Sequence, residues 1–409
     1  MAIKKDWTFT YHIQQDRERK NLAILELIRK KGPISKAEIS RTLGYNIVTI
    51  TNYLDYYIDK RIILEMGLDV SSGGRRPELL ELNAKSAYII GVDLGPESIN
   101  AVVADLKVNV IAKNKSARPR VSIEDLIPSV VKVIDDTIRK SKIDQINIKN
   151  IGIGISGIVD YPSGTIRDTD PTRGRTKVSF LKFASSVEDK FGVPVYIGND
   201  ASCAAFGEKT LNPAAGFDNV IYLYSDVGCG IVINGDVYIG SSGCAGETQL
   251  TFNSHQVDDK DRPAEYVHLR PWGVDLGVVY EAGRVIDKGA ATEILNLVKG
   301  DKNAITKEII IDAAKKGDKV AVELLNNAGR NLGIRIAYLI NLLNPSVVVI
   351  GGGMERAGDL LFEPVKATMK RYSFEEPSGI VKVMPSLLGE DAIVLGAAAL
   401  AAREVFIQV

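Results

Sequence analysis

One strand pattern occurs twice in this chain and constrains its fold more than any other feature. Residues 88–95 read Tyr-Ile-Ile-Gly-Val-Asp-Leu-Gly, an apolar run that predicts a buried strand ending at a glycine turn. Further strands are expected over residues 99–105 and around 108–113. The pattern of strand, glycine turn and strand opens again at Asn219. This internal repeat predicts two related halves around a cleft.

Between the two units, residues 152–157 have the spacing G-x-G-x-x-G. A dinucleotide-binding fingerprint with this spacing opens a helix, whereas residues 158–162 here lead into a loop. We therefore interpret these glycines as packing positions within a strand and its turn.

The first 85 residues have the spacing of a helix-turn-helix. Residues 17–31 predict a first helix, which Gly32-Pro33 stops. Ser35 can cap a second helix, with Glu38 completing a capping box, and Gly44 ends that helix. A third helix follows from Asn46. We expect it to bury Ile47, Ile50, Leu54 and Tyr57 or Ile58, and to turn outward Val48, Thr49, Asn52, Tyr53 and Tyr56.

The amino end of this third helix is expected to enter the major groove of DNA. We place Thr49, Thr51 and Asn52 nearest the base edges, because hydroxyl and amide groups both donate and accept hydrogen bonds there. A hairpin wing follows, with Arg75 and Arg76 beside glycines at its tip, within reach of a phosphate backbone or a narrow minor groove. A small helical domain with a polar face could also account for the helices, but not for the two arginines.

Charge supports this division of the chain. The 409 residues carry no net charge, but residues 1–85 contain 15 basic and 11 acidic side chains, which suits contact with nucleic acid. No signal peptide and no run of about eighteen apolar residues is present, so we expect a cytoplasmic protein without membrane contact. The three cysteines are far apart and predict neither a disulfide framework nor a metal cluster.

Taken together, these features resemble the ROK family of bacterial repressors and sugar kinases. The matching segments follow in order along nearly the whole chain: the winged head, Asp93-Leu-Gly95, and residues 154–160, 198–201, 243–247, 344–345, 347–353 and 395–399. The resemblance implies the α/β class, with a two-lobed actin-like (ribonuclease H-like) sugar-kinase fold preceded by a winged helix-turn-helix. It implies a DNA-binding domain in residues 1–85, a first lobe in 86–200 and a second lobe in 201–409, whose C-terminal helix can return to the first lobe.

The resemblance also implies an effector site. In sugar kinases of the family, an Asn-Asp pair matching Asn199 and Asp200 holds sugar hydroxyls, its Asp is the general base, and a glutamate matching Glu247 also grips the sugar. Asp200 would then be a vestigial base. It could instead cap the helix that starts at Ala201, and the two roles are compatible. The implied vestigial nucleotide-binding residues are Asp93, Gly95, Ser225, Gly351 and Gly352.

In kinases of the family, two glycine-containing turns bind the phosphates of ATP. Both turns have a different sequence in this chain. Where those kinases have Asp-x-Gly-Gly-Thr, this chain has Pro96 and Glu97 after Gly95, so an N–H group is lost and a negative charge is added. The second turn reads Tyr-Ser-Asp, and its Asp226 also repels ATP. Because phosphoryl transfer depends on positioning and charge neutralisation, we expect kinase activity to be lost.

Other departures concern the sugar and a metal. Leu250 stands where the family has a histidine. Val278 aligns with a further glutamate that binds the sugar in the family. The zinc-binding cysteines of the family are missing between Leu250 and Gly283, and His255 and His268 are too few to form a zinc site. We therefore expect neither a metal nor another cofactor.

The resulting interpretation is a transcriptional regulator, most simply a repressor, that binds double-stranded operator DNA and responds to a sugar or sugar derivative in the kinase-like cleft. A homodimer or homotetramer is expected, because two-fold symmetry matches paired half-sites. A sugar kinase with an attached DNA-binding domain is the alternative, and a regulator controlled by a partner protein is the third possibility. The arginines of residues 167–175 could instead suit an acidic or phosphorylated ligand.

Overall fold

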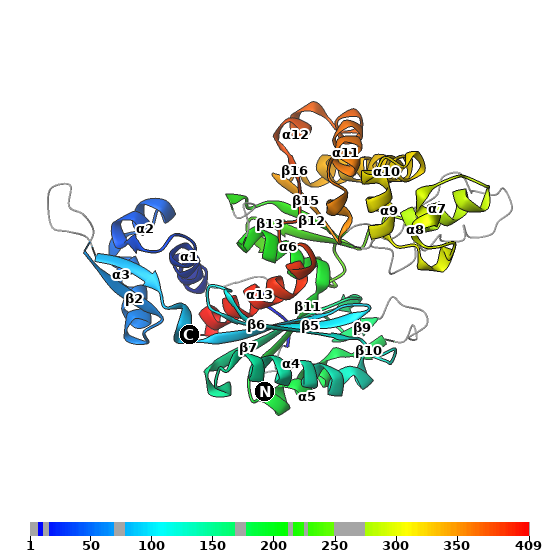
Figure 1. Cartoon of the computed structure of the whole chain (residues 1–409). Coiled ribbons are helices and arrows are strands. Elements are labelled where there is room, and N and C mark those ends of the chain that lie inside the picture. Colours follow the sequence, from blue (N-terminus) through cyan, green and yellow to red (C-terminus); the bar gives the residue numbers. More distant parts are fainter. Residues whose placement is uncertain are drawn as a thin grey trace.

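The computed structural model describes residues 7–10, 16–68, 78–167, 177–211, 216–224, 228–248 and 275–408. Figure 1 shows a small helical head beside two lobes, each built on a β-sheet. Two helices, α6 (Asp200–Leu211) and α13 (Ala392–Gln408), cross between the lobes. In the described ranges no helix has the length and apolar character needed to cross a lipid bilayer.

The head forms where its caps and apolar residues predict. Its elements are α1 (Asp16–Lys31), β1 (Ile34–Ser35), α2 (Lys36–Leu43), α3 (Ile47–Asp59), β2 (Ile63–Leu68) and β3 (Glu78–Leu82). The Ser35 hydroxyl accepts the N–H of Glu38 at 3.2 Å, and the Asn46 amide oxygen accepts the N–H of Val48 at 2.9 Å. These side chains cap α2 and α3. Gly44 ends α2 in the left-handed region, with a φ of 70°.

Burial in the head differs from expectation at two residues of α3. Ile50, Leu54 and Tyr57 are buried as predicted, but Ile47 is 47% exposed. Side chains lean towards the amino end of a helix, so Ile47, the first residue of α3, projects beyond the core. Tyr53, expected on the outer face, is partly buried against this core. The wing tip with Arg75 and Arg76 lies outside the described residues.

The first lobe contains a five-stranded sheet of order β11-β7-β4-β5-β6. Its strands are β4 (Tyr88–Leu94), β5 (Ser98–Asp105), β6 (Val110–Ala117), β7 (Ile148–Ile155) and β11 (Val195–Asn199). Strand β6 starts later than expected because Val108 lies in a turn, with a φ of 65°. Helices α4 (Ile127–Ser141) and α5 (Phe180–Phe191) pack on one face of this sheet. A small sheet adjoins it, made of β8 (Ile158–Asp160), β9 (Thr165–Arg167) and β10 (Lys177–Ser179).

The second lobe repeats this topology. Its sheet has the order β14-β13-β12-β15-β16, with β12 (Val220–Tyr224), β13 (Gly228–Ile233), β14 (Asp236–Val237), β15 (Val347–Gly351) and β16 (Lys382–Pro385). Strand β12 is antiparallel to β13 and parallel to β15, just as β4 is antiparallel to β5 and parallel to β7. The repeated sequence pattern therefore corresponds to a repeated arrangement of strands.

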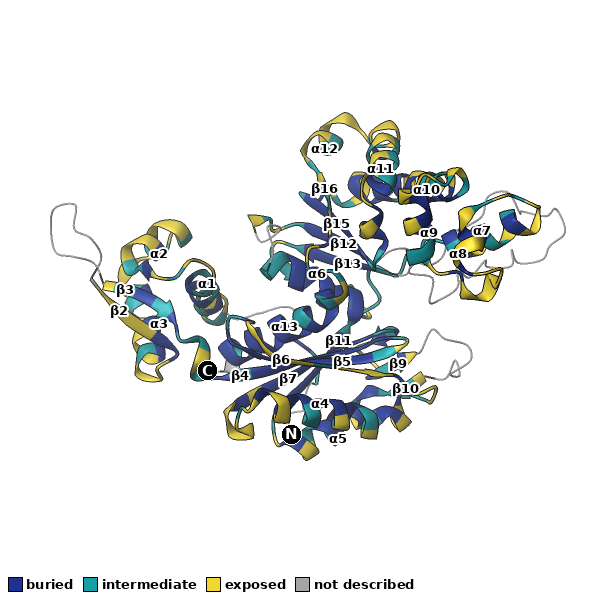
Figure 2. Ribbon diagram, viewed as in Figure 1, coloured by how far each residue is buried: buried dark blue, intermediate teal, exposed yellow. Residues whose placement is uncertain are grey.

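Helices cover both faces of the second sheet. Alternate residues of β12 pack on α6 and on the outer helices, and Figure 2 shows the strands of both sheets buried. The outer helices are α7 (Val278–Asp287), α8 (Glu293–Leu297), α9 (Lys307–Lys315), α10 (Lys319–Leu343), α11 (Asp359–Tyr372) and α12 (Glu375–Ile380). A strand buried on both faces needs apolar residues at every position, which explains the unbroken apolar runs.

Glycines allow α13 to lie directly on the first sheet and on α6. An added Cβ would lie 2.2 Å from the carbonyl oxygen of Val394 at Gly91, and 2.3 Å from that of Ala397 at Gly152. At Gly396 of α13 it would lie 1.8 Å from the carbonyl oxygen of a residue on α6. Residues 152–157 thus lie in a strand and the turn after it, in agreement with the packing interpretation.

Residues 7–10 also dock on the first lobe. The N–H of Ile197 in β11 donates to the carbonyl of Trp7 at 2.8 Å. Phe9 is buried and stacks on Tyr196, with ring centres 5.7 Å apart. The chain therefore contacts the first lobe both before and after the head: through residues 7–10 ahead of α1, and through the connection from β3 to β4.

Candidate functional site

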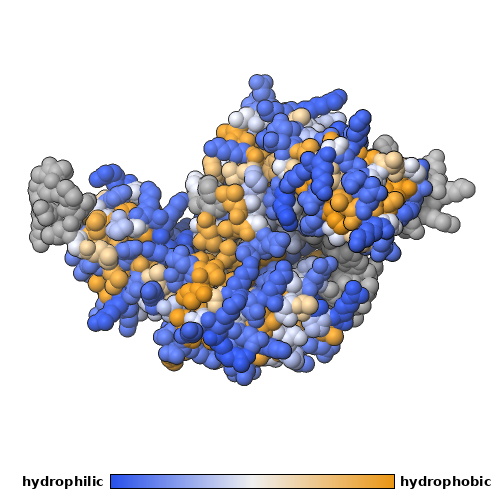
Figure 3. All heavy atoms as spheres, viewed as in Figure 1, coloured by the Kyte–Doolittle hydropathy of each residue, from blue (hydrophilic) through white to orange (hydrophobic). Residues whose placement is uncertain are grey.

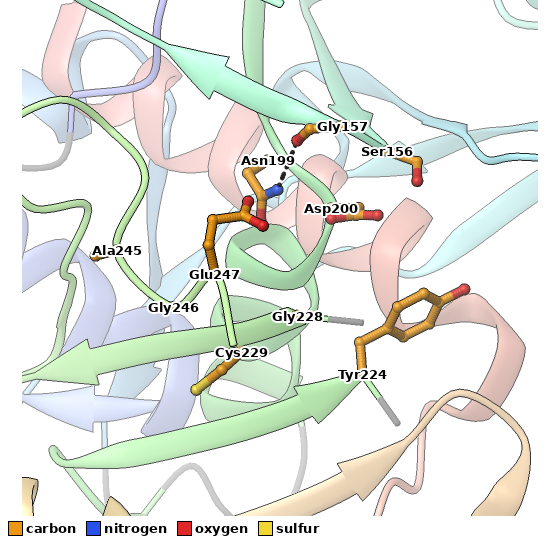
Figure 4. Close-up of a pocket in the computed structure, with 10 residues that line it drawn as sticks. All are labelled: Ser156, Gly157, Asn199, Asp200, Tyr224, Gly228, Cys229, Ala245, Gly246 and Glu247. Atoms are coloured by element: carbon orange, nitrogen blue, oxygen red, sulfur yellow. Dashed lines mark hydrogen bonds between the residues drawn. The ribbon is translucent and has the colours of Figure 1, made fainter. Parts of the chain in front are cut away.

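A narrow pocket lies between the lobes where α6 begins (Figure 4). The structure brings Asn199, Asp200 and Glu247 together in it, the three residues expected to hold a sugar. The remaining lining residues are Ser156, Gly157, Tyr224, Gly228, Cys229, Ala245 and Gly246. The cavity volume is about 10 Å³, which is room for about one water molecule. A monosaccharide can enter only if the lobes or the lining side chains move apart.

Strand β11 ends at Asn199, and α6 begins at the next residue, Asp200. The Asn199 side chain accepts the N–H of Ser202 at 3.1 Å and donates to the carbonyl of Gly157 at 3.2 Å. One oxygen of Asp200 accepts the N–H of Ala201 at 2.7 Å. Both side chains are thus oriented by the first turn of the helix. The helix begins at Asp200 and not at Ala201, so Asn199, and not Asp200 as expected, is the residue that caps it.

Three carboxyl groups have perturbed acidity: Asp200 and Glu247, which line this pocket, and Asp93, which does not line it but interacts electrostatically with Asp200. Burial raises the pKa of Asp200 to about 6 and that of Asp93 to about 7. Burial, followed by repulsion from Asp200, raises the pKa of Glu247 to about 8, while Arg167 opposes the shift. One oxygen of Asp93 accepts the amide of Asn100 at 2.8 Å, and the other is buried without a partner among the described residues. A protonated carboxyl both donates and accepts, which suits the hydroxyl groups of a neutral ligand.

The first phosphate turn, between β4 and β5, is closed by its own chain. The N–H of Gly95 donates to the carbonyl of Ser98 at 3.0 Å, and Pro96 has no N–H group. Arg118 is buried beneath the turn and donates to the carbonyl of Gly95 at 3.0 Å. The side chain of Glu97 is exposed. Neither Gly95 nor Pro96 can therefore donate a backbone hydrogen bond to a phosphate.

The glycine loop after β15 is closed in a similar way. The N–H of Gly353 donates to the carboxylate of Glu355 at 2.7 Å, and Lys307 donates to the carbonyl of Gly352 at 2.6 Å. The N–H group of Gly353 is thus bonded to an acidic group of this chain and is not available to a phosphate. Gly351 ends β15, where an added Cβ would lie 2.0 Å from the hydroxyl of Tyr222.

A family comparison agrees with this geometry. The model of the ROK family matches residues 89–254 and 280–404. This chain belongs to the ROK family. The xylose repressor of Caldicellulosiruptor bescii is 30% identical over 385 residues, which are 93% of this chain and 94% of that repressor.

Solved ROK structures share the fold. A ROK family transcriptional regulator, a homologue of the Escherichia coli Mlc protein, has a TM-score of 0.77 and 23% identity, and the match covers 96% of this chain and 98% of the other. A ROK family glucokinase from Streptomyces griseus, in complex with glucose and AMPPNP, has a TM-score of 0.64 and 27% identity over 77% of this chain and 99% of its own. The expected fold class and family are confirmed.

The DNA-facing residues expected on α3 of this ROK protein differ in accessibility. Asn52 is exposed and Thr49 is half-buried. The hydroxyl of Thr51 donates to the carbonyl of Ile47 at 2.9 Å, so only its acceptor capacity is available. Ile47 and Val48 are 47% and 61% exposed at the amino end of α3. These two apolar side chains, which were not assigned to DNA contact, could meet thymine methyl groups.

Three residues of the ROK cleft were not identified from the sequence. Ser156 lines the pocket and acts to lower the pKa of Asp200, and its place in the motif of residues 154–160 was the available signal. Glu355 could have been noticed because it lies two residues after three consecutive glycines. No sequence pattern indicates the role of Arg118, because only the tertiary structure places it beneath the turn between β4 and β5.

Part of the expected site lies outside the described residues, namely Ser225, Asp226, Leu250, His255 and His268. Their roles stay predictions. Val278 is described and is buried at the start of α7. No group of three His, Cys, Asp or Glu residues that could hold a metal ion is found in the part of the chain that the structure describes.

The raised pKa of Glu247 predicts a pH dependence of stability. Its ordinary value is 4.5 and its folded value is about 8, so the folded state holds a proton that the unfolded state releases between these limits. The contribution of Glu247 to the free energy of unfolding is full below 4.5 and is lost as the pH rises to about 8. The slope is at most about 1.4 kcal/mol per pH unit.

We therefore expect Glu247→Gln to become more stable relative to the wild type as the pH rises through this window. Urea unfolding at several pH values measures the difference. Glu376→Gln, at an exposed position of α12, is the control for loss of one acidic group. A stability difference that stays constant with pH would contradict the assignment.

Proposed function

We propose that this ROK protein is a transcriptional repressor that binds operator DNA through residues 1–85 and is released from it by a sugar. The proposal depends on a difference between the two parts of the cleft, the part expected to bind sugar and the part expected to bind nucleotide. Asn199, Asp200 and Glu247 line a common pocket, whereas the turn between β4 and β5 and the glycine loop after β15 are closed by groups of the same chain. A pocket of this kind keeps ligand binding without phosphoryl transfer.

The names of similar proteins support this proposal. The relative described above is a xylose repressor, and its match extends over 93% of this chain. Xylose is therefore the first candidate effector. Its neighbouring hydroxyl groups suit a site of carboxyl and amide side chains, which hold vicinal hydroxyls by paired hydrogen bonds.

The proposed coupling uses relative movement of the lobes. We assign the lobes to residues 86–200 and 201–409, with α13 packed on the sheet of the first. A sugar between Asp200 and Glu247 contacts both lobes and favours one arrangement of them. In a homodimer or homotetramer, this changes the spacing of the DNA-binding heads relative to paired half-sites.

Titration of sugars against an operator fragment tests the proposal. With full-length protein and fluorescently labelled operator, xylose or a related aldose is expected to weaken binding about 5- to 150-fold, a coupling of about 1–3 kcal/mol. ATP consumption is measured on the same samples and is expected to stay at background. Asn52→Ala should lose preference for the operator over unrelated DNA and keep sugar binding. Asn296→Ala, at an exposed position of α8, is its matched control.

Two outcomes would overturn the proposal. Operator affinity that no pentose or hexose changes would exclude a sugar-responsive repressor. Sugar-dependent ATP consumption would instead favour the kinase alternative, in which Asp200 still acts as a general base.

A further inference from the structure

A second cavity lies at the junction between the head and the lobes, away from the sugar pocket. Helix α1 of the head here meets α6, α13 and the turn between β13 and β14. The cavity volume is about 330 Å³, enough for a small metabolite. Figure 3 shows hydrophobic side chains gathered between the head and the second lobe on the visible face, with hydrophilic ones over most of the rest.

The lining of this junction cavity is charged, with an excess of basic groups. Five basic and three acidic side chains line it. Arg29 donates to Glu26 through two nitrogens, at 2.9 and 2.7 Å. Arg403 of α13 donates to Asp236 at 2.6 Å. Over the whole lining, basic groups outnumber acidic groups by two, so the cavity favours an anion over a cation.

Arg403 supplies the strongest indication of a ligand. It is only 3% exposed, and its Nε and Nη1 atoms are buried with no hydrogen-bond partner among the described residues. Its guanidinium lies over the ring of Phe206, 5.6 Å from the centroid, which holds the group in place but satisfies no N–H. Leaving buried N–H groups of a charged side chain unpaired is costly. Because these two atoms have almost no accessible surface, an acceptor oxygen reaches them only when the side chains that line the cavity shift.

Lys209 of α6 is the second basic group at this cavity. It lies at the turn between β13 and β14, where an added Cβ at Gly235 would be 3.3 Å from its ammonium nitrogen. Burial lowers the pKa of Lys209, although Glu26 and Asp218 act against this shift. The nearby carboxylates therefore do not fully compensate the burial of its charge.

We propose that the junction cavity binds a small anion of the phosphate class, held by Lys209 and Arg403. Both residues lie on helices that cross between the lobes, whereas Glu26 and Arg29 belong to α1 of the head. A bound anion therefore stabilises one placement of the head relative to the lobes. Inorganic phosphate and the phosphate group of a sugar phosphate offer the same acceptor oxygens. This site is separate from the sugar pocket and does not depend on the function proposed above.

Calorimetric titration of the full-length protein tests this proposal. Inorganic phosphate and glucose 6-phosphate are titrated at constant ionic strength, with chloride as the reference anion. We expect both to bind, and the tighter of the two identifies the source of the phosphate group. Lys209→Met and Arg403→Met are each expected to weaken binding about tenfold or more, because each removes a charged donor. Lys288→Met, at an exposed position after α7, is the matched control.

The variants separate this site from the sugar pocket. Lys209→Met should retain the response to sugar, which also shows that the variant is folded. Loss of the sugar response with retained phosphate binding would refute only the proposed function. Phosphate binding no tighter than chloride, or equal binding by Lys209→Met and Lys288→Met, would overturn the anion site.

Discussion

Replacing Asp200 by alanine is expected to abolish induction by sugar while leaving operator binding intact. The carboxyl of Asp200 is buried at the pocket and accepts the N–H of Ala201 in the first turn of α6. Loss of hydrogen bonds from a ligand hydroxyl to such a group costs about 2–3 kcal/mol, which raises the Kd for the sugar roughly 30- to 150-fold. Calorimetry with the most effective sugar measures the Kd, and operator titration measures the response.

Stability should change little in this variant, because loss of the bond to Ala201 is offset by removal of a buried carboxyl whose pKa is raised by burial. Asp189→Ala, at an exposed position of α5, is the matched control and should keep both activities. A sugar Kd in Asp200→Ala equal to that of the wild type would exclude this pocket as the effector site.

Replacing Gly396 by alanine is expected to destabilise the whole protein. The added Cβ would lie 1.8 Å from the carbonyl oxygen of Cys203, where α13 crosses α6. A backbone atom cannot rotate away as a side chain can, so the two helices must separate. Overpacking of a core costs about 1–3 kcal/mol and occasionally more, and we expect about 3 kcal/mol or more here. Urea unfolding measures the loss, which should be accompanied by weaker sugar binding because α6 carries Asp200.

Gly283→Ala provides the contrasting substitution. Gly283 lies within α7, and an added Cβ there meets no atom within 4 Å. Alanine favours the helix by up to about 1 kcal/mol over glycine, so this variant should be as stable as the wild type or more stable. Equal destabilisation by the two substitutions would mean that close packing of α6 and α13 is not what requires glycine at position 396.

The sequence predicted those parts of the fold that depend on near neighbours in the chain. Ser35 and Gly44 were expected to cap and to end the second helix through contacts within a few residues, and the structure shows them in these roles. Apolar runs with glycine turns predicted the paired strands at residues 88 and 219. Residues Asn199, Asp200 and Glu247 were expected together through family resemblance, since nothing local requires their proximity.

The predictions that were wrong or missing concern residues whose role depends on tertiary packing. Ile47 has the right spacing for the core of the head, yet it is exposed because it lies at the end of its helix. Glu355 closes a glycine loop, and its effect on phosphate binding follows from a bond to Gly353 that periodicity does not predict.

By itself, the sequence determined the repeated strand–turn–strand units and the helix-turn-helix of the head, because hydrophobic periodicity and capping act over one strand or one helical turn. The two-lobed α/β architecture was expected from the family resemblance that these patterns carry. Tertiary structure decided which distant groups meet. Lys209 and Arg403 are joined at one cavity only because α6 and α13 cross, and Asp93, Asp200 and Glu247 have raised pKa values only because folding buries them. Burial and charge proximity are properties of the packed molecule, so no local pattern encodes them.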